Sequence, residues 1–198
     1  MFKLRTGTDL ILASGSPRRK KILEDMGLHF RIQKPDIEEV RLKDESPEKY
    51  ASRLAFEKAQ KVAMEFPTSW ILAADTDVFI DGEVLGKPVD EDDAFRLLRL
   101  ISGRDHSVWS SFALLCEDLG KNCVVASESV VSISKLSDED IWSYIATGEP
   151  MDKAGAYAAQ GIASSFINKI TGNYDSIVGL DSCKLREKLL EFGLLVYG

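Results

Sequence analysis

The chain has 198 residues, of which 44% are hydrophobic and 29% charged, and its formal net charge is −7. The length predicts one domain over residues 1–198, in one body or as two lobes around a common sheet. The acidic excess argues against a surface for polymeric nucleic acid, although a local basic pocket for one nucleotide stays possible. No apolar run approaches the ~20 residues that span a bilayer, and the short polar start does not resemble a signal peptide. We therefore expect a cytoplasmic protein without a membrane partner, with its three cysteines reduced.

The first predicted elements are a short strand, a tight turn and the start of a helix. The strand is the apolar run Leu10–Ala13, the turn is Ser14–Ser16, and Pro17 suits the first position of a helix. The free N–H groups and the dipole at such a helix start form an anion site, and Arg18 and Arg19 add charge that suits phosphate oxygens. The pattern indicates a phosphate-binding turn, but an ordinary helix start with solvated basic residues explains these ten residues equally well.

The remaining elements follow from capping residues, apolar runs and turn signals. They are a strand at 29–32, a helix from Pro47 capped by Ser46, a buried strand at 70–74, a hairpin turn at 81–82, a helix at 90–100, strands at 107–116 and 124–133, a helix capped by Ser137, a strand at 166–170 and a helix at 185–192. Strands and helices alternate early, whereas the middle is hairpin-like. This mixture predicts an α/β fold with a mixed sheet.

Two acidic segments are candidates for a metal site. Asp75 follows the apolar run 70–74, so we expect it to project from the tip of a buried strand. A carboxylate in that place holds a divalent cation, activates a water, or only caps a turn. Glu38 and Glu39 can supply a second carboxylate to the same ion, although acidic loops are usually just solvated. The residue types alone leave these alternatives open.

Three other polar residues are candidates with weaker support. Lys87 follows the predicted hairpin, where an exposed lysine is the default. His106 begins a strand and is more typical of a structural hydrogen bond than of catalysis. Gln160 lies among small residues, where its amide can read a base edge or satisfy the backbone.

Taken in order, these motifs resemble the Maf family of nucleoside triphosphate pyrophosphatases. The matching segments extend over nearly the whole chain and are Leu12–Arg19, Glu38–Glu39, Leu54–Ala59, Ala74–Thr76, Gly86–Pro88, Ser102–Val108, Gly148–Tyr157, Gln160–Gly161 and Val178–Leu180. The resemblance implies an elongated mixed sheet flanked by helices, with two lobes and a nucleotide-binding cleft as in inosine triphosphate pyrophosphatases. It also implies a homodimer that hydrolyses nucleoside triphosphates between the α- and β-phosphates.

The resemblance also assigns roles to individual residues. Asp75 accepts the proton of the attacking water, and Glu39 and Asp75 hold Mg²⁺ or Mn²⁺; whether Asp75 is base, ligand or both stays open. The residues implied in phosphate binding are Ser14, Arg19, Lys87 and Lys58, and those at positions that separate substrate subgroups are Arg18, Thr76 and Gln160. The segment Tyr157–Gly161 is similar to the subgroup that acts on dTTP and UTP, so pyrimidine triphosphates, including modified ones, are the expected substrates.

Two positions depart from the family pattern. Asp77 replaces an apolar residue and can add a carboxylate near the metal, and Asp181 replaces a proline at the start of the last helix. An alternative function belongs to a different class of protein. The chain would then be a nucleotide-binding regulator of cell division and septum formation that acts through a protein partner.

Overall fold

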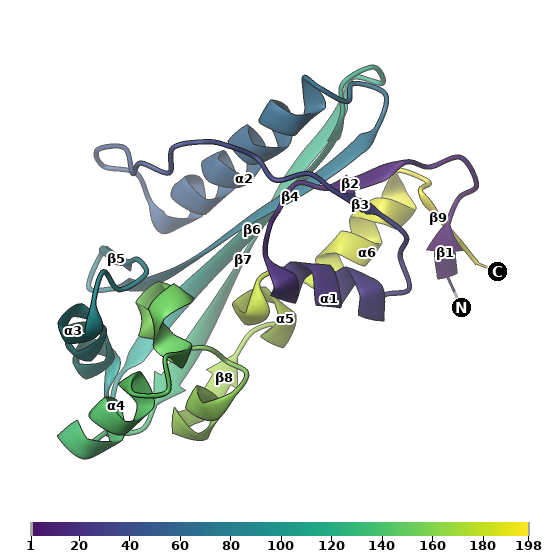
Figure 1. The fold of residues 1–198 in the computed structure, drawn as a ribbon. Helices are drawn as coiled ribbons and strands as arrows, with labels where there is room; N and C mark the ends of the chain where they lie inside the picture. The colour runs from purple at the N-terminus through teal and green to yellow at the C-terminus, as the bar shows by residue number, and fades with distance from the viewer. Residues whose placement is uncertain (1, 198) are drawn as a thin grey trace. The chain divides into compact units, whose positions relative to one another are not determined.

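The computed structural model describes residues 2–197, which form a mixed α/β fold (Figure 1). Its strands are β1 (Phe2–Leu4), β2 (Leu10–Leu12), β3 (Arg31–Ile32), β4 (Trp70–Ile80), β5 (Glu83–Leu85), β6 (Asp105–Cys116), β7 (Lys121–Ile133), β8 (Ile167–Thr171) and β9 (Leu195–Tyr197). Its helices are α1 (Pro17–Asp25), α2 (Pro47–Ala63), α3 (Glu91–Ile101), α4 (Asp138–Ile145), α5 (Tyr174–Val178) and α6 (Ser182–Glu191), with the 3₁₀ helices η1 (Glu149–Asp152), η2 (Ala154–Ala156) and η3 (Ile162–Phe166).

The main sheet contains both parallel and antiparallel pairs. Its strand order is β3-β2-β4-β6-β7-β8, with β5 paired to β4, and β1 and β9 form a separate two-stranded sheet. Strand β2 is parallel to β3 and β4. Strand β5 is antiparallel to β4, and β8 is antiparallel to β7. The predicted mixed α/β class is therefore confirmed.

The chain divides into two compact units. The first unit comprises residues 1–75, 110–127 and 179–198, and the second comprises residues 76–109 and 128–178. In the first unit, α2 packs on the sheet through small residues such as Ala55 and Ala59, which share one hydrophobic cluster with Ile71 and Ala73 of β4. Successive side chains of a strand point to opposite faces. Trp70 accordingly points the other way and packs against Phe192, just after α6, with the ring planes tilted by 34° and 5.1 Å between ring centroids.

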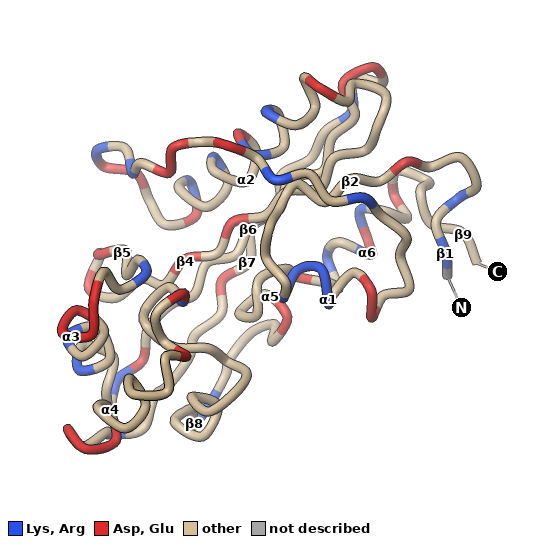
Figure 2. The backbone as a smooth tube through the Cα atoms, in the orientation of Figure 1, with Lys and Arg blue, Asp and Glu red and all other residues tan. Residues whose placement is uncertain are grey.

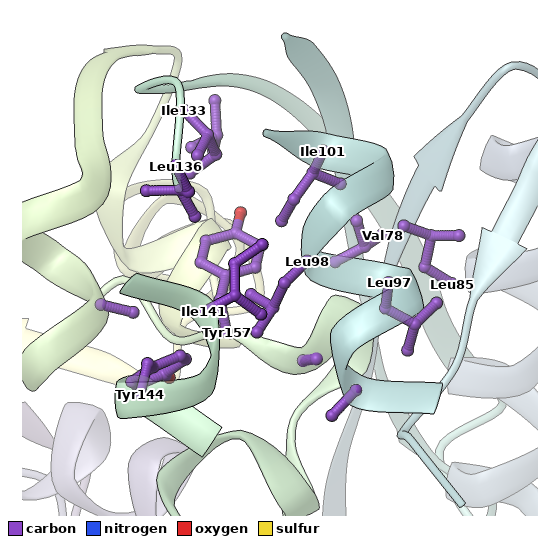
Figure 3. Close-up of a cluster of buried hydrophobic side chains, with 14 of the residues drawn as sticks. Val78, Leu85, Leu97, Leu98, Ile101, Ile133, Leu136, Ile141, Tyr144 and Tyr157 are labelled. Carbon is purple, nitrogen blue, oxygen red and sulfur yellow. The ribbon is translucent and has the colours of Figure 1, made fainter. Parts of the chain in front are cut away.

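The second unit has its own hydrophobic core (Figure 3). Leu97, Leu98 and Ile101 of α3 pack with α4 and with the apolar side chains at the end of β4. Tyr157 lies among them, so the irregular segment after η2 is anchored in this core. Burial of such side chains is the main stabilising contribution to this unit.

Most predicted element starts are confirmed. Ser16, Ser46 and Ser137 cap α1, α2 and α4 through their hydroxyl groups, and Pro17 and Pro47 occupy the first helical turns. The Asp81–Gly82 turn joins β4 to β5 with both residues at positive φ, as a two-residue hairpin requires. Asp181, which replaces a proline of the family pattern, caps α6 by accepting a hydrogen bond from the Lys184 N–H at 3.0 Å.

Two predictions need correction, and one strand pairing was not predicted. β3 is confined to Arg31–Ile32 and is shorter than the predicted strand 29–32. The pairing of β1 with β9 was not predicted, because three-residue strands carry almost no periodicity. Asp75 does not lie at a strand tip: β4 continues to Ile80, since residues 78–80 are again buried and pair with β5.

Two further features concern the hydrophobicity of the helices and the state of the cysteines. None of the helices within residues 2–197 combines the length and the hydrophobicity that crossing a membrane requires. Cys116, Cys123 and Cys183 are free thiols, as expected.

Candidate active site

The turn from β2 into α1 is organised around the hydroxyl of Ser14. Ser14 is buried, and its Oγ accepts hydrogen bonds from the Ser16 N–H and from Arg19 Nη1, both at 3.2 Å. Ser16 Oγ in turn accepts from the Arg19 N–H at 3.5 Å. The side chains thus fix the turn and hold it at a helix N-terminus, a geometry that favours anions.

The guanidinium of Arg19 is held from two sides. Besides its bond to Ser14, its Nε donates to the Gly179 carbonyl at 2.9 Å. The half-buried Arg18 precedes it, and basic residues crowd the start of α1 (Figure 2). A guanidinium fixed in this way loses little conformational entropy when it binds a phosphate oxygen.

Sequence reasoning missed a further basic residue, Lys34. A Cβ added to Gly15 would lie 2.8 Å from Lys34 Cε, so the Lys34 side chain runs directly over the turn. Gly15 is therefore the residue that leaves room for this stem. The only signal in the sequence was that Lys34 follows β3 after a single intervening residue, and the predicted strand at 29–32 was not used to place it.

The second group in the first unit is a buried ammonium between two carboxylates. Lys58 is only 7% exposed although it lies on a helix, α2, and Asp75 is 4% exposed on β4. Lys58 Nζ lies 2.5 Å from Asp75 Oδ1 and 2.6 Å from Glu39 Oε1. Buried charges persist only when they are paired, so Lys58 and Asp75 hold each other in place, whereas the Glu39 carboxylate reaches Lys58 from a more exposed position.

The register of the parallel strands places the two groups at neighbouring positions. Leu12 of β2 lies opposite Leu72 of β4, and the Ala13 N–H donates to the Leu72 carbonyl at 2.7 Å. Parallel strands are about 4.8 Å apart. The turn at Ser14 therefore begins beside the part of β4 that leads to Asp75.

The oxygen donors of this group suit a hard divalent cation. Asp75 and Glu39 converge on one point of positive charge, the Lys58 ammonium. Among the residues that the structure describes, no cluster of three or more histidine, cysteine or acidic side chains forms a closed metal site. Mg²⁺ is commonly held by one or two carboxylates together with substrate phosphates, and the two carboxylates fit that pattern.

The other predicted residues belong to the second unit. Thr76 and Asp77 are half-buried on β4, whereas Lys87 and Gln160 are exposed. The loop that carries Lys87 is tied to η2, because the Gly155 N–H donates to the Gly86 carbonyl at 3.0 Å.

His106 and Arg104 have structural partners. His106, 3% exposed, hydrogen-bonds through Nε2 to the Tyr157 hydroxyl at 2.6 Å, and Arg104 makes two 2.8 Å contacts with Asp81. Burial lowers the pKa of His106 to about 4, although the negative charge of Asp105 acts to raise it. The ring is therefore neutral at neutral pH. His106 is thus a structural hydrogen bonder in this fold.

The chain resembles the Ham1 protein of Staphylococcus aureus with a TM-score of 0.53 at 15% identity, covering 94% of this chain and 100% of that one. This likeness defines the α/β fold class and nothing finer. The sequence goes further: the profile of the Maf-like protein family matches residues 9–192, and the chain belongs to the Maf family.

Relatives in this family have a consistent name. A protein from Desulfotalea psychrophila is 42% identical over 94% of this chain and 95% of its own length. One from Koribacter versatilis is 41% identical over 98% of this chain and 100% of its own length. Both are named dTTP/UTP pyrophosphatase.

Proposed function

We propose that this chain is a nucleoside triphosphate pyrophosphatase that hydrolyses dTTP and UTP to the nucleoside monophosphate and pyrophosphate. The observation that carries the proposal is the buried Lys58 ammonium between Asp75 and Glu39, in the same unit as the basic turn at Ser14. An acidic group beside an anion-binding turn is what metal-assisted attack on a phosphate requires. The names of the full-length relatives support the same reaction.

Asp75 and Glu39 are the proposed ligands of Mg²⁺ or Mn²⁺. When bound, such an ion would neutralise phosphate charge and lower the pKa of a water near it. Asp75 is the proposed proton acceptor for that water, because its carboxylate is held in place by Lys58 in a site that largely excludes solvent. Lys58 compensates the carboxylate charge, and we assign it a place among the phosphate-binding residues.

The proposed phosphate contacts come from Ser14, Arg19 and Lys87. Charge grows on the leaving pyrophosphate during hydrolysis, so fixed cations stabilise the transition state more than the bound substrate. Arg19 meets this requirement because two hydrogen bonds already orient its guanidinium.

The proposed base contact is Gln160, with Arg18 and Thr76 as further specificity residues. The glutamine amide offers a donor and an acceptor, which match the O4 and N3–H edge of thymine and uracil. Cytosine presents the opposite order on that edge, so a fixed amide disfavours CTP by roughly fivefold to a hundredfold.

The test is pyrophosphate release from a panel of triphosphates, with Mg²⁺ or Mn²⁺, by the full chain and by Asp75→Asn. We expect turnover of dTTP and UTP well above that of CTP and 7-methyl-GTP, and loss of it in the variant. Nucleotide binding without hydrolysis would contradict the enzyme and favour the regulator of cell division. The homodimer stays a prediction, which light scattering of the purified chain tests.

A further inference from the structure

Side chains fix the segment 157–163 at three points within the second unit. His106 binds the Tyr157 hydroxyl at 2.6 Å, and the Tyr174 hydroxyl donates to the Ala159 carbonyl at 3.3 Å. Beyond Gln160, the carboxylate of Glu149 accepts from the N–H groups of Ile162 at 3.1 Å and Ala163 at 3.3 Å. Gln160 lies in the middle of this fixed segment and is exposed, as are Gly161 and Ile162 after it.

Glu149 is itself held in one orientation. The Tyr144 hydroxyl donates to its Oε1 at 3.0 Å, and Tyr144 is fully buried in the core of this unit. Partial burial alone would raise the pKa of Glu149, but the two N–H groups, the Tyr144 hydroxyl and Lys153 together lower it. The carboxylate is therefore charged and bonded at neutral pH, between the core and the loop.

Gly161 shows how closely the carboxylate approaches the loop. A Cβ on Gly161 would lie 2.7 Å from Glu149 Oε2, and its φ of +81° is one that other residues rarely adopt. The carboxylate of Glu149 therefore lies against the backbone directly after Gln160. This close approach requires a glycine at position 161.

We propose that Glu149 is a positioning residue for base selection: through the N–H groups of residues 162 and 163 it fixes the loop that presents the Gln160 amide. An exposed amide rotates freely and can show a base either its donor or its acceptor. Discrimination requires an amide that is held in one place against the base, and Glu149 contributes to this by holding the backbone on the side where the 3₁₀ helix η3 begins. This inference rests on the proposed function, in which Gln160 reads the pyrimidine edge.

The decisive substitution is Glu149→Gln, which keeps the size of the side chain but replaces one acceptor oxygen with an NH₂ group that faces the loop N–H groups. The preference for UTP over CTP in kcat/KM should fall to that of Gln160→Ala, a loss of roughly fivefold to a hundredfold. The loss should come mostly from faster CTP hydrolysis and a higher KM for UTP, with kcat for UTP nearly unchanged. The matched control is Glu139→Gln, an exposed acid on α4 of the same unit, which should keep the wild-type preference.

A second readout does not depend on activity. Amide hydrogen exchange of Ile162 and Ala163 should accelerate in Glu149→Gln and stay unchanged in Glu139→Gln. If Glu149→Gln folds poorly, Tyr144→Phe serves instead, since it removes one hydrogen bond to Glu149 and keeps the ring in the core; a smaller loss of preference is then expected.

The outcomes separate the inference from the function. Equal loss for UTP and CTP, or an unchanged preference in Glu149→Gln while Gln160→Ala loses it, would overturn the role of Glu149 alone. No hydrolysis of any triphosphate by the wild-type chain would overturn the proposed function, whatever the exchange rates of the loop.

Discussion

His106 links burial in the second unit to a measurable pH dependence. Burial lowers its pKa from 6.5 to about 4, whereas the unfolded chain titrates near the ordinary value. Between these two pH values the unfolded chain binds one more proton than the folded protein, so the free energy of unfolding falls as the pH drops. The contribution is complete above pH 6.5 and is lost by about pH 4. At 1.36 kcal/mol for each pKa unit, the loss is about 3 kcal/mol.

The perturbation that isolates this effect is His106→Phe. The ring keeps most of the packing, but the Tyr157 hydroxyl loses its partner, which costs about 1–3 kcal/mol at every pH. Urea unfolding between about pH 4.5 and 7 should give a steep fall in the free energy of unfolding for the wild type and a flatter one for the variant. His29→Gln is the control, because His29 is the chain's other histidine and is exposed. Parallel curves for wild type and His106→Phe, or an imidazole that titrates near pH 6.5 by NMR, would show that burial of His106 does not produce the pH dependence.

Three further predictions concern the first unit and the phosphate contacts. Asp75→Asn keeps the shape of the side chain but removes the base and a metal ligand, so kcat should fall by roughly a hundredfold or more, and near-normal turnover would contradict the assignment. Lys58→Met leaves two carboxylates without their cation and should lower the free energy of unfolding by about 3 kcal/mol. The same substitution should cost clearly less in an Asp75→Asn background, and equal costs in this double-mutant cycle would show that Lys58 and Asp75 are not coupled. Arg19→Ala and Lys87→Ala should each lower kcat/KM about tenfold to a thousandfold for every triphosphate alike, whereas a loss confined to one base would mean that they read the base.

The local signals in the sequence predicted much of the first unit. Ser16 and Ser46 each precede a proline and a helix, and both act as caps because a serine hydroxyl satisfies the free N–H groups there. The strand, turn and helix start around Ser14 were predicted for the same reason, since all three are encoded within ten residues.

What the sequence did not predict depends on contacts between distant segments. The apolar run before Asp75 indicated a strand end, but pairing with β5 extends β4 through three polar residues. Lys58 sits on a helix, where lysine is usually solvated, and only the fold brings it between Glu39 and Asp75. Glu149 belonged to a recognised motif, yet its bonds to residues 162 and 163 cross more than ten positions and leave no local pattern.

Product analysis after incubation with UTP and Mg²⁺ decides which phosphate bond the protein cleaves. We expect UMP and pyrophosphate in equal amounts from the wild-type chain, with neither formed at a comparable rate by Asp75→Asn. Release of UDP and inorganic phosphate, or unchanged product formation by the variant, would contradict this expectation.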